Sequence, residues 1–146
     1  MAGRFKQGYY KPKNPEKYIG NVEKIRYMSS WEYSLHSFLD SNVQIIRWGS
    51  EPVRIPYIKP TDGKIHHYLP DYYVEYIDKL GLIRKIIVEV KPAKQTKASR
   101  ARNPQTQLYE NVQFAINTAK WQACQIFCMR NGFEFQILTE KQLYGK

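Results

Sequence analysis

The chain has 146 residues, of which 42% are hydrophobic and 25% charged, and its formal net charge is +10. This length fits one domain that buries a core without disulfide bonds, and no apolar run is long enough to cross a membrane. The first six residues contain no apolar stretch, so we expect no secretory signal. Cys124 and Cys128 lie four residues apart in a helical pattern and are expected to be packed, reduced thiols.

The positive charge is concentrated in the two flanks of the chain. Residues 1–27 hold seven Lys and Arg against two acids, and residues 92–146 hold eight against three. Residues 28–91 hold eight of each and are neutral. Basic flanks favour a polyanionic partner such as nucleic acid, because Lys and Arg release counterions when they neutralise phosphates. Charge by itself does not indicate any chemistry.

The N-terminal part is expected to begin with an arm and to continue with a helix. Residues 1–17 mix Gly, Lys, Tyr and Pro without periodicity, which indicates a basic extended arm ahead of a single domain at 18–146. A helix is expected from Ser29 to about Asp40, since Ser29 and Glu32 form a capping box.

Strands dominate the middle of the chain. Hydrophobic and β-branched residues alternate in four segments separated by turn residues, and the longest of these segments contains Pro70, which marks a bend or an edge. The expected strands are Val43–Trp48, Val53–Tyr57, Ile65–Tyr76 and Leu82–Lys91.

Helices return in the last third. Ala93–Arg102 contains four cations and no acid, and it is expected to be an exposed basic loop. Asn103 and Pro104 then begin a long helix that ends near Gly132, with a possible break at 117–120. A strand at 133–138 and a short helix at 139–144 follow. This order predicts an α/β fold with a mixed central sheet flanked by helices.

Glu89 and Lys91 give the clearest chemical signal. Strand side chains alternate, so these two residues share one face near the end of an apolar strand. A buried acid at this position needs a cation or a metal ion as its partner. A surface ion pair at a strand end would give the same pattern, so this pair alone is weak evidence.

Asp71 follows Pro70 on the preceding strand. A tight turn at residues 78–81 would make the two strands antiparallel neighbours and bring Asp71 close to Glu89 and Lys91. Two carboxylates beside a lysine suit a hard divalent cation that activates water and stabilises charge on phosphate oxygens. Turn or bulge chemistry after Pro70 would explain Asp71 but would leave the Glu89–Lys91 pattern unexplained.

These residues resemble the PD-(D/E)XK nuclease superfamily, over roughly residues 29–140. More narrowly, the chain resembles the transposon-end endonuclease subunits and the head-completion nucleases of tailed phages. The supporting segments are 29–32, 55–57, 69–72, 88–92, Asn117 with Lys120 and Trp121, 133–135 and 138–140.

The resemblance implies a restriction-endonuclease-like core and metal-dependent hydrolysis of phosphodiester bonds in DNA. It implies Mg²⁺ as the cofactor, with Mn²⁺ able to replace it. The implied metal ligands are Asp71, Glu89 and the carbonyl of Val90. Lys91 would be the catalytic lysine, and Glu32, which a capping box also explains, would be an additional catalytic acid.

DNA contacts are expected from the basic segments. The loop contributes Lys94, Lys97, Arg100 and Arg102, and the arm contributes Lys11 and Lys13, although the arm's mixture of tyrosine and lysine also suits docking on a protein. Gln105 and Tyr109 match a pattern of related exonucleases, but any helix yields such pairs easily, so we prefer a role on the helix surface.

The resemblance therefore implies a DNA endonuclease acting in phage head completion. Its expected partners are DNA and portal or neck proteins of the phage. Its expected locations are the virion and the host cytoplasm, and no membrane is expected. One alternative is a non-catalytic DNA-binding structural protein of the phage particle. Another is a junction-resolving or transposon-end nuclease.

Overall fold

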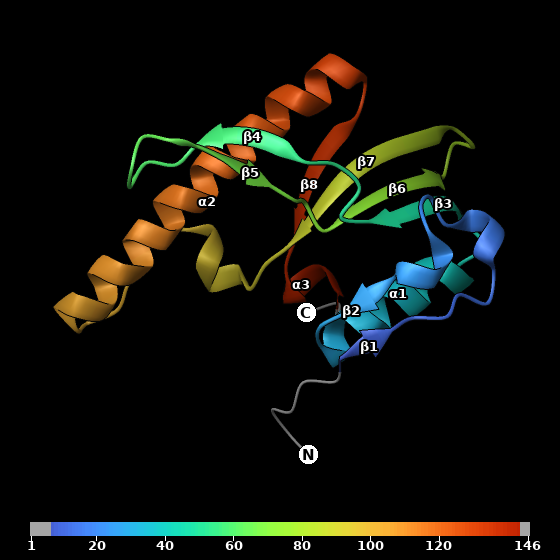
Figure 1. Ribbon diagram of the computed structural model, residues 1–146, viewed down its shortest axis with the longest axis horizontal. Coiled ribbons are helices and arrows are strands. Elements are labelled where there is room, and N and C mark those ends of the chain that lie inside the picture. Colours follow the sequence, from blue (N-terminus) through green and yellow to red (C-terminus); the bar gives the residue numbers. More distant parts are fainter. Residues whose placement is uncertain (1–6, 144–146) are drawn as a thin grey trace. The chain divides into compact units, whose positions relative to one another are not determined.

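The computed structural model describes residues 7–143, so Met1–Lys6 of the expected arm lie outside the described part. The elements follow in the order β1 (Gly8–Tyr9), η1 (Pro15–Lys17), η2 (Val22–Lys24), β2 (Arg26–Tyr27), α1 (Ser30–Ser41), β3 (Ile45–Ser50), β4 (Ile55–Ile58), β5 (Ile65–Tyr68), β6 (Tyr72–Ile77), β7 (Ile83–Val90), η3 (Ala93–Thr96), α2 (Pro104–Asn131), β8 (Glu134–Leu138) and α3 (Glu140–Leu143) (Figure 1). None of the described helices has the length and apolar character needed to span a membrane.

A four-stranded sheet of order β3-β6-β7-β8 is the centre of the fold. β3 and β6 are antiparallel, with a register shift between Ile45 and Arg47. The helix α2 connects β7 to β8, and such a crossover is what a parallel pair of strands requires. The predicted α/β fold with a mixed central sheet is therefore confirmed. Two small antiparallel sheets pair β1 with β2 and β4 with β5.

The chain divides into two compact units. Unit 1 comprises the residues up to Pro52 together with Tyr72–Ile86, and unit 2 comprises Val53–Asp71 together with the residues from Ile87 onward. The chain therefore passes between the units after Pro52, after Asp71 and after Ile86.

The expected strand Ile65–Tyr76 is wrong in one respect, because it forms two strands. β5 ends at Tyr68 and pairs with β4, whereas β6 begins at Tyr72 and pairs with β3. Pro70 lies between them and is fully buried. Its nitrogen has no hydrogen to donate to a neighbouring strand, so the ladder stops there and the chain changes partner.

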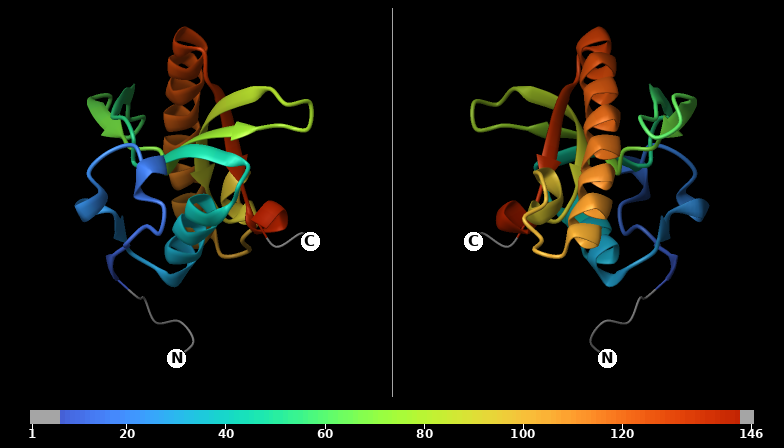
Figure 2. Two further views of the ribbon diagram at one scale, coloured as in Figure 1. Left: turned by 90° about the vertical axis from the view of Figure 1, so that its right-hand side faces the viewer. Right: turned by 90° about the vertical axis from the view of Figure 1, so that its left-hand side faces the viewer.

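The long helix α2 is continuous, so the possible break at 117–120 does not occur (Figure 2). Asn103 caps its first turn by accepting hydrogen bonds from the N–H groups of Gln105 and Thr106, and Gly132 ends it in a left-handed conformation with φ of 74°. No glycine or proline interrupts the helix after Pro104, which explains its length of 28 residues.

The buried side of α2 builds the core of unit 2. Ile116, Trp121, Cys124 and Cys128 are buried along it, and the helix packs against β4. Both cysteines are free, which confirms that they are packed thiols. Burial raises the pKa of each thiol, so both are neutral at physiological pH.

In unit 1, rings pack around Trp48, which has no exposed surface. The ring of Tyr18 lies 4.7 Å from it and that of His36 lies 5.3 Å from it, centroid to centroid. His36 is held at both nitrogens, with Nε2 at 2.9 Å from the carbonyl of Arg26 and Nδ1 at 2.8 Å from the hydroxyl of Tyr72. His36 is therefore a structural residue of unit 1.

Asp40 fixes the segment that precedes η1. Its side chain is fully buried and accepts hydrogen bonds from the hydroxyl of Tyr10 (2.8 Å) and from the N–H groups of Lys13 (2.6 Å) and Asn14 (3.0 Å). Burial alone raises the pKa of Asp40, but these hydrogen bonds outweigh burial and lower the pKa below 3.8. The described part of the expected arm, residues 7–17, is thus attached to α1.

We predict that Asp40→Asn lowers the free energy of unfolding by about 3 kcal/mol, because an amide cannot accept all of these hydrogen bonds. Since the pKa is lower in the folded state, the wild-type carboxylate stabilises the fold above the unfolded pKa of 3.8 and loses this effect as the pH falls through the folded pKa. Urea unfolding at several pH values measures both effects. The control Glu23→Gln changes an exposed acid of unit 1, and an equal effect there would contradict the prediction.

Candidate functional site

Glu89 lies at the buried end of β7, in unit 2. Only 5% of it is exposed, and the three residues before it are also buried. Its Oε1 accepts a hydrogen bond from the hydroxyl of Tyr68 at 2.8 Å, and its Oε2 lies 3.8 Å from Nζ of Lys91. The alternation predicted for this strand therefore brings Glu89 and Lys91 to the same side, with Lys91 partly exposed.

Asp71 lies beside this pair, although it comes from a different part of the chain. Pro70 ends the pairing of β5, and the next residue points its carboxylate at β7, where Oδ2 accepts a hydrogen bond from the N–H of Val90 at 2.7 Å. The structure therefore brings together Asp71, Glu89, Val90 and Lys91, four of the residues singled out by the sequence.

The two carboxyl groups influence each other strongly. Burial first, and then the charge of Glu89, raises the pKa of Asp71. Burial also raises the pKa of Glu89, although the hydrogen bond from Tyr68 and the charge of Lys91 oppose that rise. Two buried acids side by side cannot both ionise at low energy unless a positive charge compensates them. The single ammonium group of Lys91 meets only part of that need.

This donor set fits a hard divalent cation. Two carboxylates and a neighbouring backbone carbonyl supply oxygen ligands, and Mg²⁺ typically completes its shell with water and substrate phosphates. Within residues 7–143, no group of three or more His, Cys, Asp or Glu side chains is placed to hold a metal ion. A metal site here would therefore be an open one. Water and substrate would supply most of the ligands of the ion.

Tyr68 is a residue of this site that the sequence did not indicate. It is 4% exposed, and burial together with the charge of Glu89 raises its pKa far above the usual range. Its hydroxyl therefore stays protonated and acts as a permanent donor that orients Glu89. No motif marks Tyr68, because its position depends on where Pro70 ends the strand.

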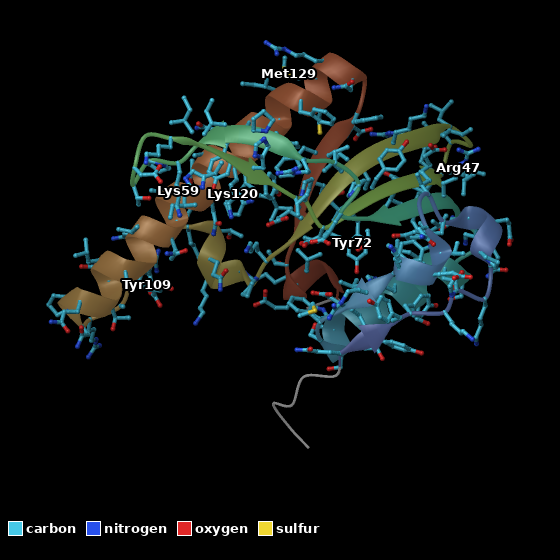
Figure 3. The ribbon with its side chains drawn as sticks, viewed as in Figure 1. Arg47, Lys59, Tyr72, Tyr109, Lys120 and Met129 are labelled. Atoms are coloured by element: carbon cyan, nitrogen blue, oxygen red, sulfur yellow. The ribbon has the colours of Figure 1, made fainter. Side chains whose placement is uncertain are left out.

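Lys120 is a second residue that sequence reasoning did not assign to the site. It projects from the middle of α2 (Figure 3), and its Nζ lies 5.9 Å from the ring centre of Tyr57 and 5.8 Å from that of Tyr68. Burial lowers the pKa of Lys120, and the charge of Lys91 lowers it further. With Lys91 and Asn117 it lines one cavity. The signal for it in the sequence is its place, with Asn117 and Trp121, among the segments that support the family resemblance.

Glu32 lies in unit 1, at the first turn of α1. Its carboxylate accepts a hydrogen bond from the N–H of Met28 at 2.9 Å, while its own N–H donates to the hydroxyl of Ser29 at 3.1 Å. These two hydrogen bonds resemble a capping box. The difference is that Glu32 accepts from the N–H of Met28, one residue before the N-cap Ser29. The capping explanation accounts for Glu32, and its role as an additional acid stays a prediction.

The predicted basic loop, residues 93–102, exposes its cationic side chains. It begins with η3, and Ser99 ties it to α2 by donating its N–H to Asn111 at 2.8 Å and its hydroxyl to Glu110 at 2.7 Å. The four cations on it, Lys94, Lys97, Arg100 and Arg102, are exposed. Lys11 and Lys13 are exposed in unit 1. A phosphate backbone therefore has accessible cations to contact in each unit.

Comparisons with known proteins find one matching family model and one similar curated protein. Residues 42–140 match the family model described as TnsA-like endonuclease N terminal. The chain is 36% identical over 142 residues to the head completion nuclease of Enterobacteria phage T4, an alignment that covers 93% of this chain and 92% of that protein. No solved structure matches the chain significantly.

Proposed function

Because this chain belongs to the TnsA-like endonuclease family, we propose that it is a Mg²⁺-dependent endonuclease that hydrolyses phosphodiester bonds of DNA. The observation that carries the proposal is the buried carboxyl group of Glu89, with the part-buried carboxyl group of Asp71 and the ammonium group of Lys91 beside it. The same three residues form the motif on which the sequence resemblance rests. A surface ion pair would not bury Glu89 to 5% exposure or place a second carboxyl group next to it.

In the proposed mechanism, Asp71, Glu89 and the carbonyl of Val90 would hold the metal ion. When bound, Mg²⁺ supplies Lewis-acid stabilisation of the phosphate and lowers the pKa of a water molecule. The hydroxyl of Tyr68 and the N–H of Val90 hold the two carboxylates in position. This orientation is set before DNA arrives, which reduces the reorganisation that the reaction requires.

Two lysines complete the proposed site. Lys91, 3.8 Å from Glu89, places an ammonium group where charge accumulates on the phosphate oxygens and helps to position the attacking water. Lys120 adds a second ammonium group, which the rings of Tyr57 and Tyr68 hold in place. We keep Glu32 as a proposed additional acid, to be tested separately because it lies in unit 1.

We propose that the nuclease acts in phage head completion, by processing packaged DNA or preparing filled heads for tail joining. The support is its similarity to a protein named for that step. The proposed partners are DNA and a portal or neck protein, and the proposed locations are the host cytoplasm and the virion. The second candidate is a transposon-end or junction-resolving nuclease, and the match to a TnsA-like family model supports the first of these two.

We predict that Asp71→Asn and Glu89→Gln each reduce plasmid cleavage with Mg²⁺ by at least about 100-fold, because each removes a charged ligand. Both should also weaken Mn²⁺ binding, measured by calorimetry. Lys91→Ala should lose turnover but still bind Mn²⁺, since a protonated lysine is not a ligand. Asp62→Asn, an exposed acid of unit 2, is the control. Wild-type cleavage by either carboxylate variant would disprove the assignment.

A second prediction concerns the exposed cations of the basic loop. Replacing Lys94, Lys97, Arg100 and Arg102 by glutamine should weaken binding to all DNA sequences alike. It should also flatten the dependence of log K on log salt, by about 0.9 for each phosphate contact that is lost. The control replaces Lys24, Lys64, Lys79 and Lys85, which are exposed elsewhere. Equal slopes for the two variants would place the DNA away from the loop.

The third prediction tests the biological role. In a phage that depends on this gene, Glu89→Gln should allow heads to fill with DNA but give few tailed, infectious particles. Electron microscopy of lysates and titres measure the two effects, and purified wild-type protein added to the extract should restore joining. Normal titres with a catalytically inactive protein would favour a structural role for the chain in the particle.

A further inference from the structure

A cavity of about 310 Å³ in unit 2 opens beside the proposed site, between the segment 91–99 and one face of α2. We call it the α2 groove. Four ammonium groups line it, those of Lys91, Lys94, Lys97 and Lys120. Lys91 also lies 3.8 Å from Glu89, so the groove begins at the residues proposed to cut DNA. A cavity lined in this way attracts a polyanion.

The helical wall of the α2 groove has a different character. Tyr109, Gln113 and Asn117 recur every four residues and therefore form one stripe that leads along α2 to Lys120. Tyr109 lies well toward the N-terminal end of the helix from Lys120 (Figure 3), and 65% of it is exposed. An exposed ring and two amide side chains are suited to the face and the edges of a base, whereas a phosphate needs neither.

One acid, Glu110, also lines the groove. Its carboxylate accepts a hydrogen bond from the hydroxyl of Ser99 at 2.7 Å. The neighbouring Asn111 accepts one from the N–H of Ser99 at 2.8 Å. Glu110 therefore helps to fix the wall of the groove, and the four lysines still outnumber it.

We propose that the α2 groove binds an unpaired nucleotide of the DNA strand next to the phosphate that is cut, so that the protein prefers duplexes with a single-stranded end. This inference rests on the proposed nuclease function. A cavity of about 310 Å³ is of the size that holds a small ligand, so a nucleotide fits it and a duplex does not. The lysines contact the phosphates while the base stacks on Tyr109.

The test compares three DNA molecules that share one duplex: blunt, carrying a four-nucleotide single-stranded extension, and carrying the same extension without bases. Affinity is measured by fluorescence anisotropy without divalent ions, so that binding is independent of cleavage. Wild-type protein should bind the extended duplex about tenfold more tightly than the blunt one, the effect of one stacked base. Removing the bases from the extension should abolish this gain.

Substitutions at Tyr109 make the test specific. Tyr109→Ala should reduce the preference for the extended duplex to about one, whereas Tyr109→Phe should keep it because the ring remains. Leu108→Ala is the matched control, since Leu108 is also exposed on α2 but does not line the groove. Circular dichroism and thermal unfolding verify that each variant is folded.

Three results would overturn the inference: equal wild-type affinity for blunt and extended duplexes, an unchanged preference in Tyr109→Ala, or a full gain from the extension without bases. Cleavage of the same DNA with Mg²⁺ separates the two proposals. Cleavage without any preference would disprove the groove alone, whereas a preference without cleavage would disprove the nuclease function alone.

Discussion

The placement of a part-buried carboxyl group, that of Asp71, beside the buried carboxyl group of Glu89 is the constraint on which the rest of the candidate site depends. Burial raises the pKa of both Asp71 and Glu89, because little water reaches the two carboxyl groups, and the charge of Glu89 raises the pKa of Asp71 further. The groups around them are donors or cations: the hydroxyl of Tyr68, the N–H of Val90 and the ammonium of Lys91. The two carboxyl groups together therefore favour the binding of a positive charge, and a divalent cation would supply it.

Most of the fold could be predicted because its signals are local. Ser29 caps α1, Asn103 caps α2 and Gly132 ends it, and in each case the residue acts on its own turn of helix. The sequence marks Pro70 as a bend or an edge, but it does not predict that the chain changes its strand partner there. Whether a strand merely bends or changes its partner depends on which neighbouring strands are present, and that information is not contained in the segment itself.

In the candidate site, too, residues marked by local patterns could be predicted and residues placed by tertiary packing could not. Asp71, Glu89 and Lys91 could be grouped from the alternation of β7 and the turn before it, which are short-range features. Tyr68 and Lys120 could not, since the first depends on where β5 ends and the second on how α2 packs against the β4–β5 hairpin. For Glu32 the local pattern is ambiguous, because the same spacing from Ser29 is compatible with a capping role and with a catalytic role.

The uninterrupted course of α2 also has an evolutionary consequence. One face of α2 turns to the core and carries Trp121, Cys124 and Cys128. A different part of the helix lines the α2 groove with Tyr109 and Gln113, so the two sets of side chains do not need to contact each other. Mutations on the groove stripe can therefore accumulate without compensating changes in the core. What the groove accepts can therefore change by substitution while the scaffold that positions Asp71 and Glu89 stays the same.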